Sequence, residues 1–182
     1  GVPDYTAGVA GTDIKWKRFG NIATVDMCYA ADGVNFPTPC ENILNNYNMT
    51  ANEHTITTWT PPQGIGNIYK IKVVDAGDAT VESPPSLAFK VQGKLTLTAP
   101  TTTAVWAMGE TRDIEWDINQ GNVGFVKLVG SRSGNFTGGA DEFTITSSTD
   151  ADNVVTFNAA NPDPRGKGKF TWTLVDTYGA SI

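Results

Sequence analysis

Apolar and polar residues alternate along much of this chain, in short runs separated by Gly, Pro, Asn and Asp. In the clearest run, Tyr69, Ile71 and Val73 alternate with two lysines. A period of two is typical of a β-strand that buries one face. No longer segment keeps the apolar period of roughly 3.6 residues that marks a helix. The pattern therefore predicts an all-β protein.

The alternating pattern occurs twice along the chain. Ile14 and Trp16 recur as Ile114 and Trp116, 100 positions later. Each pair is followed by a polar gap and then by a second apolar run. An internal repeat of this length indicates two copies of one module.

A late alternating strand that closes on Asp and Gly also occurs in both halves, at 68–77 and at 170–179, and we expect these strands to be equivalent. Short strands punctuated by turn residues are typical of β-sandwiches. The sequence therefore predicts two β-sandwich domains in tandem, covering residues 1–92 and 93–182.

The two copies differ at their ends. The first continues into a final strand at 87–91 without a counterpart in the second, and the second opens with a leader at 95–100 that the first lacks. We expect the second sandwich to lack its last strand, as in a chain processed from a longer repeat protein. Because native proteins seldom leave a long sheet edge bare, residues 1–10 of another copy are candidates to fill it by strand addition.

The chain is acidic. Its 182 residues include 13 Lys and Arg against 19 Asp and Glu, which gives a net charge of −6. No basic stripe is present to neutralise phosphates, which argues against nucleic acid as a partner. The apolar runs fall well short of the ~20 residues that a membrane-spanning helix needs. We therefore expect no nucleic-acid partner and no membrane insertion within this segment.

Cys28 and Cys40 are the only cysteines, and His54 is the only histidine. A structural zinc site needs about four ligands, and the spacing is not the Cys-x-x-Cys of a redox pair. We therefore expect a disulfide, which implies an oxidising, extracytoplasmic compartment. Asn48 and Asn135 each begin an Asn-x-Thr triplet, the acceptor pattern for N-glycosylation.

Framework residues of the two copies follow a shared order: Gly11, Ile14, Trp16, Tyr29, Asp32, Gly33, Trp59, Tyr69, Ile71 and Val73 in the first, and Pro100, Trp106, Gly109, Ile114 and Trp116 in the second. This order resembles the immunoglobulin-like repeat of fungal Ser/Thr-rich, GPI-anchored and cell-wall-synthesis proteins, which also occurs in tandem in large secreted bacterial proteins. The resemblance implies immunoglobulin- or fibronectin-III-like β-sandwiches and a spacer, adhesion or wall-associated role at the cell surface. It supplies no catalytic residues. The chain departs from the pattern at its two cysteines and at 131–134, where the second copy has no Asp-Gly turn.

Aromatic residues are candidates either for the core or for a surface on which sugar rings stack. Trp16 and Trp116 are in phase with the isoleucines of their strands, so we expect both in the core. Trp59 could pack in the core or form a ligand platform, and Tyr178 is a second candidate platform. The expected core framework comprises Ile14, Trp16, Tyr69, Ile71, Ile114, Trp116 and Trp172.

Acidic residues gather at 75–82 and at 141–152, where loops could offer oxygen ligands to Ca²⁺. The Asp-x-Asp-x-Asp-Gly spacing of a calcium loop is missing, so we expect no cofactor, with calcium as the one candidate. Nucleophile-elbow, zinc-protease and phosphate-loop motifs are also missing from the sequence. We therefore expect no enzymatic activity.

The features together predict an extracellular structural protein of tandem immunoglobulin-like modules. We expect it to self-assemble into a filament or surface layer, by head-to-tail contacts or strand donation, with other copies of itself as partners. The alternative is a carbohydrate-binding, adhesin or spacer module of a larger secreted surface protein, with cell-wall polysaccharide as its partner.

Overall fold

The computed structural model describes residues 4–11, 13–146, 155–156 and 166–174. Within these residues the chain forms strands and no helix, so the predicted all-β class is confirmed. The chain divides into two compact units, Gly1–Lys94 (unit 1) and Leu95–Ile182 (unit 2). The division falls within two residues of the boundary expected between 92 and 93.

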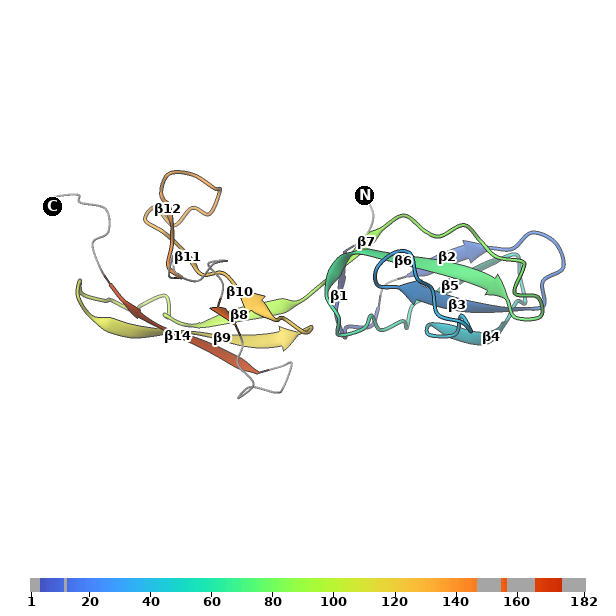
Figure 1. The fold of residues 1–182 in the computed structure, drawn as a ribbon, viewed down its shortest axis with the longest axis horizontal. Helices are drawn as coiled ribbons and strands as arrows, with labels where there is room; N and C mark the ends of the chain where they lie inside the picture. Colours follow the sequence, from blue (N-terminus) through green and yellow to red (C-terminus); the bar gives the residue numbers. More distant parts are fainter. Residues whose placement is uncertain (1–3, 12, 147–154, 157–165, 175–182) are drawn as a thin grey trace. The chain divides into compact units, whose positions relative to one another are not determined.

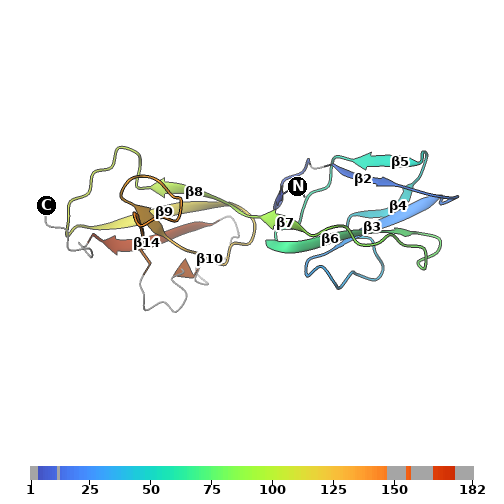
Figure 2. The ribbon, with the colours of Figure 1, turned by 90° about the horizontal axis from the view of Figure 1, so that it is seen from above.

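Unit 1 contains two β-sheets (Figures 1 and 2). Its strands are β1 (Asp4–Thr6), β2 (Ile14–Lys17), β3 (Thr24–Ala30), β4 (Leu44–Asn48), β5 (Glu53–Ile56), β6 (Gly66–Asp75) and β7 (Phe89–Gln92). One sheet has the order β1-β7-β6-β3-β4. In this sheet β1 is parallel to β7, and all other neighbouring strands are antiparallel. The other sheet is the antiparallel pair β2-β5. In Figure 2 this pair lies above β3 and β6.

One hydrophobic cluster joins the two sheets of unit 1. Ile14 and Ile56 enter it from the β2-β5 pair, and Met27, Tyr69 and Phe89 enter it from the larger sheet. Alternation in each strand places these residues on one face, so the two sheets bury their apolar faces against each other.

A disulfide joins Cys28 on β3 to Cys40 in the β3–β4 connection, as predicted. Both cysteines are buried beside Val74 of β6, and Phe36 packs against this cluster. Closing a loop of this size stabilises the fold by about 3 kcal/mol in the chain-entropy description.

Within the described residues, unit 2 contains a three-stranded sheet and two short antiparallel strand pairs. Its strands are β8 (Lys94–Ala99), β9 (Thr111–Gln120), β10 (Phe125–Val126), β11 (Val129–Ser131), β12 (Glu142–Thr144), β13 (Val155–Thr156) and β14 (Lys167–Thr173). The sheet has the order β14-β9-β8, and β10 pairs with β13 and β11 with β12. The buried core consists of Ile114, Trp116, Ile118, Val126 and Leu128.

The late strands of the two halves take different places, which corrects the expected equivalence of 68–77 and 170–179. Strand β6 pairs with β3 and β7, whereas β14 pairs directly with β9, with Gly168 opposite Trp116. Alternation along a strand shows which face is buried but not which strand lies beside it. The closing residues of the second late strand, and any final strand after it, lie outside the described residues.

Candidate functional site: an open strand edge in unit 1

Strand β2 has a partner on one side only. It pairs with β5, with Ile14 opposite Ile56 and Lys17 opposite Glu53, and no other strand of the described residues pairs with it. The Arg18 amide continues this ladder by donating to the Asn52 carbonyl at 2.9 Å. Successive backbone groups of a strand point to opposite sides. The amides and carbonyls of Lys15 and Lys17 therefore point away from β5, along an open edge.

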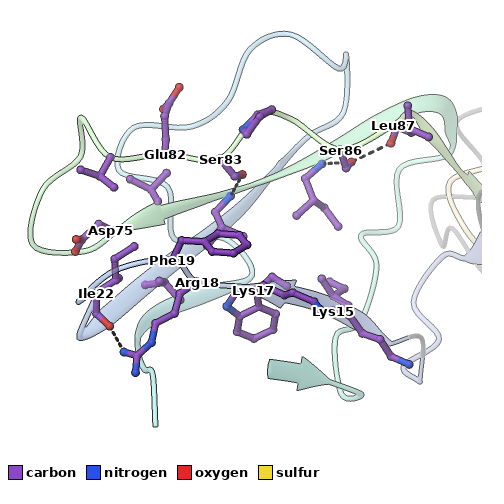
Figure 3. A pocket seen from close by; sticks show the side chains of 18 of the residues that line it. Lys15, Lys17, Arg18, Phe19, Ile22, Asp75, Glu82, Ser83, Ser86 and Leu87 are labelled. Atoms are coloured by element: carbon purple, nitrogen blue, oxygen red, sulfur yellow. Dashed lines mark hydrogen bonds between the residues drawn. The ribbon is translucent and has the colours of Figure 1, made fainter. Parts of the chain in front are cut away.

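This open edge forms one wall of a groove of about 1040 Å³. Figure 3 shows Lys15, Lys17 and Phe19 along this wall and the 82–87 segment along the other. The apolar lining includes Ile14 and Trp16 from β2 and Ile71, Val73 and Phe89 from the larger sheet. The groove is therefore an opening onto the same apolar layer that holds the two sheets together.

The opposite wall, residues 81–87, is hydrogen-bonded to β6. The Ser83 amide donates to the Val73 carbonyl and the Ser86 amide to the Ile71 carbonyl, both at 2.8 Å. The hydroxyls of the same two serines accept from the amides of Val73 and Ile71. Pro84 follows and has no amide hydrogen to donate. The two walls thus differ, because the Ser83 and Ser86 amides are used within unit 1, whereas the amides and carbonyls of Lys15 and Lys17 point away from β5.

Several large apolar side chains at the groove are exposed. Phe19 and Leu87 are 86% and 77% exposed, and Val81 is 44% exposed. All three line the groove. Exposed apolar side chains on both walls of a groove are a feature of interaction surfaces.

The rim of the groove is charged. Lys15 forms an ion pair with Asp13 at 3.4 Å, and Lys17 with Glu53 on β5. These ion pairs are solvent-exposed and contribute little stability. Deeper in the groove, burial raises the pKa of the Tyr5 phenol above its ordinary value, so this group is neutral over the physiological pH range. The floor is therefore uncharged and the rim carries the charge.

Trp16 is half-buried beside the groove. Its indole stacks on the His54 ring at a centroid distance of 5.5 Å, meets Tyr47 edge-on, and donates from Nε1 to the Met49 sulfur at 3.4 Å. Of the other expected framework residues, Ile14, Tyr69, Ile71, Ile114 and Trp116 are buried and Trp172 is partly buried.

Trp59, a candidate ligand platform, is only 7% exposed. Its ring packs edge-on against Tyr5 at 5.3 Å and against Phe89 at 6.1 Å. With its faces covered, Trp59 is a core residue in this structure and is not available for stacking on a sugar. Tyr178, the other candidate, lies outside the described residues. Asn48 and Asn135, the candidate glycosylation sites, are both exposed.

The N-terminal segment is used within its own unit, which corrects the idea that residues 1–10 are free to fill another copy. Strand β1 pairs with β7, and the Ala7 amide donates to the Gln92 carbonyl at 2.9 Å. Tyr5 and Ala7 are buried in the core cluster. A segment anchored in this way cannot be donated without opening its own core.

Two of the acidic residues at 75–82 accept hydrogen bonds within their own turns. Asp75 accepts from the Gly77 amide, and Asp78 accepts from the amide and hydroxyl of Thr80. The hydrogen bonds from Thr80 lower the pKa of Asp78. Within the described part of the chain, no three His, Cys, Asp or Glu side chains come together as a metal site would require. The same residues include no helix long and apolar enough to cross a membrane.

No protein family, curated protein or solved structure that was compared matches this chain. The groove was not predicted from the sequence. The alternation along 12–17 shows which face of the strand is buried but carries no signal for an unpaired side.

Proposed function

We propose that this chain is a non-catalytic, extracellular structural protein whose units assemble by adding a strand from another copy to the open edge of β2. The single observation that carries this proposal is that edge, whose outward backbone groups pair with no strand of the described residues and which opens onto an apolar groove. Strand addition combines main-chain hydrogen bonds, which give affinity, with side-chain pockets, which give specificity.

The strand arrangement of unit 1 supports an immunoglobulin-like reading. In that fold, the second and fifth strands lie in one sheet and the third, sixth and seventh lie in the other. The strands β2 and β5 follow this rule, as do β3, β6 and β7, and β4 adds to the larger sheet as in variable-type domains. The disulfide departs from antibody domains, because it joins β3 to its following loop within one sheet.

The extracellular part of the proposal rests on that disulfide. Disulfides form and persist in oxidising compartments, and the cytosol keeps thiols reduced. Cys28 and Cys40 both take part in the bond, and no cysteine is left free. A structural role at the cell surface agrees with this chemistry.

The proposal is tested by blocking the β2 edge without touching the β2-β5 ladder. Lys15→Pro removes an amide hydrogen that points into the groove, and proline is tolerated at such edge positions. Lys15→Thr is the matched control, because it removes the same charge and keeps the amide. We expect the natural chain and Lys15→Thr to assemble at micromolar concentration, and Lys15→Pro to stay monomeric.

Sedimentation velocity measures assembly, and negative-stain electron microscopy shows whether the assemblies are regular fibres. Far-UV circular dichroism of each variant confirms that the sheets are retained. If the natural chain stays monomeric at high concentration, or if Lys15→Pro assembles as well as Lys15→Thr, the proposed function is wrong.

A further inference from the structure

Resting on the proposed function, we infer that the strand added to β2 is β8 of a second copy. The two edges then form one continuous sheet, β5-β2-β8-β9-β14, that runs from unit 1 of one copy into unit 2 of the next. Strand β8 is itself an edge strand, because within the described residues it pairs with β9 alone.

The exposed leucines of β8 favour this assignment. Every residue of β8 except Ala99 is exposed, including Leu95 at 43% and Leu97 at 59%. Leu97 lines a cavity together with Ile114 and Leu128, so it lies on the core side of the unit 2 sheet. Leu95 shares that side, because side chains two residues apart in a strand share a face.

A continuous sheet places both cores on the same side. Leu95 and Leu97 of the second copy would then cover the β2 groove, where Phe19 and Leu87 are exposed. The pairing would therefore remove apolar surface of both partners from water. The outward side chains of β8 are Lys94, Thr96 and Thr98. Strand β8 therefore brings one lysine, at its first residue, and its two threonines can lie beside Lys15 and Lys17 without adding like charge.

Other edges of the described residues fit β2 less well. Strand β14 presents Lys167 and Lys169, and β2 paired with itself would set lysines beside lysines; like charges on neighbouring strands are destabilising. Strand β4 is irregular, with Asn46 at a φ of 47° and a register shift in its pairing with β3. The free side of β5 is electrostatically acceptable, but β5 has no exposed apolar residue to cover the groove.

The pairing joins two different surfaces, so it is heterologous. Each copy has one β2 edge to fill and one β8 edge to offer, and a contact of this type repeats without limit unless the rotation closes a ring. The inference therefore gives the assembly its polarity: unit 1 of each copy binds unit 2 of the next.

The test uses cysteine cross-linking between two variants of the full chain. One preparation carries Lys17→Cys on β2 and the other carries Thr96→Cys on β8; both positions are exposed. The native cysteines are buried in their disulfide and do not react. The two preparations are mixed, allowed to assemble and treated with a short bismaleimide. We expect the mixed cross-link to exceed either self cross-link by about tenfold, as for a preference of about 1.4 kcal/mol.

Two matched variants decide between edges. Lys169→Cys on β14 and Thr55→Cys on β5 replace Thr96→Cys in parallel mixtures, and both should cross-link weakly to Lys17→Cys. If assembly occurs but Thr55→Cys, Lys169→Cys or a second Lys17→Cys is the preferred partner, β8 is the wrong strand and the proposed function stands. If the unmodified chain does not assemble at all, the proposed function fails first.

Discussion

The same Ile-x-Trp strand has two different surroundings in the two units. Strand β9 of unit 2 lies between β8 and β14, whereas β2 of unit 1 has β5 on one side and an open groove on the other. The difference follows from the segment that precedes each strand. Residues 94–99, which precede β9, form β8, whereas the described residues that precede β2 form β1, which pairs with β7 in the other sheet. The strand sequence therefore sets which face is buried, and the segments that fold beside the strand set how many partners it has.

The tryptophans show the consequence of these surroundings. Trp116 is 2% exposed and lies opposite Gly168, where an added Cβ would come within 2.0 Å of the indole. Trp16 lies opposite His54, stacks on its ring and is only half-buried. A glycine in unit 2 lets the indole lie against the neighbouring backbone, and the aromatic neighbour in unit 1 holds the indole beside the groove.

The largest expected effect separates these two tryptophans. Trp116→Ala removes a fully buried side chain and should destabilise unit 2 by about 3–5 kcal/mol. Trp16→Ala removes a half-buried side chain at an open edge, so unit 1 should lose clearly less. Hydrogen exchange, measured by mass spectrometry on peptides from each unit, reports the two stabilities separately.

Equal losses of protection in the two variants would contradict the comparison, because they would mean that the groove leaves Trp16 as well packed as Trp116. A matched Leu87→Ala variant controls for the groove itself. Leu87 is exposed, and surface substitutions of this kind usually change stability by no more than about 0.5 kcal/mol.

The disulfide provides the next largest effect, and it should act on unit 1 alone. Replacing Cys28 and Cys40 by serine releases the β3–β4 loop and should cost unit 1 about 3 kcal/mol. Unit 2 has no cysteine, so its exchange rates should stay at the natural values. The same peptides measure both units. We expect unit 1 to exchange faster in the variant than in the natural chain.

If the cysteine substitutions accelerate exchange in both units equally, the units do not unfold independently. The expectation of two separate stabilities would then be wrong. Treating the natural chain with a mild reductant tests the same point without substitutions.

The sequence predicted what alternation and spacing encode directly. The all-β class follows from the period of two, and the disulfide follows from two cysteines with no metal-binding partners. The open edge of β2 could not be read from alternation, because pairing on either side of a strand leaves the same apolar face. Trp59 was ambiguous for a related reason: the Thr-rich run around it does not reveal that Tyr5 and Phe89 cover its ring.

The N-terminal segment shows a further limit of the sequence. Residues 1–10 have too little alternation to identify a strand, yet β1 is held by parallel pairing with β7, more than 80 residues away. Long-range pairing of this kind depends on a neighbour that the local pattern does not contain. The same limit explains why β14 was matched to β6, although it pairs with β9.

The smallest expected effect concerns an ion pair between two neighbouring strands of unit 2. On the outer face of unit 2, Asp113 of β9 accepts from the Lys169 ammonium at 2.8 Å and from the Thr171 hydroxyl. These bonds, that from Lys169 first, lower the pKa of Asp113 below its ordinary value of 3.8, and the same contact raises the pKa of Lys169. Both groups are exposed, so the contribution is small.

A lowered carboxyl pKa in the folded state stabilises the fold above the unfolded-state pKa, and this contribution is lost as the pH falls through the folded-state value. The raised ammonium pKa acts in the opposite direction: its contribution is present below the ordinary value of 10.5 and is lost as the pH rises through the folded-state value. Asp113→Asn should therefore lower the stability of unit 2 at neutral pH and match the natural chain in strong acid. Unit 2 peptides followed by hydrogen exchange at a series of pH values, corrected for intrinsic exchange, measure the difference.

Lys169→Gln should produce the same loss at neutral pH, and the double variant should lose no more than either single one. Losses that simply add would show that the two side chains act separately, and the ion pair would then contribute nothing to the outer face of the β9–β14 pair.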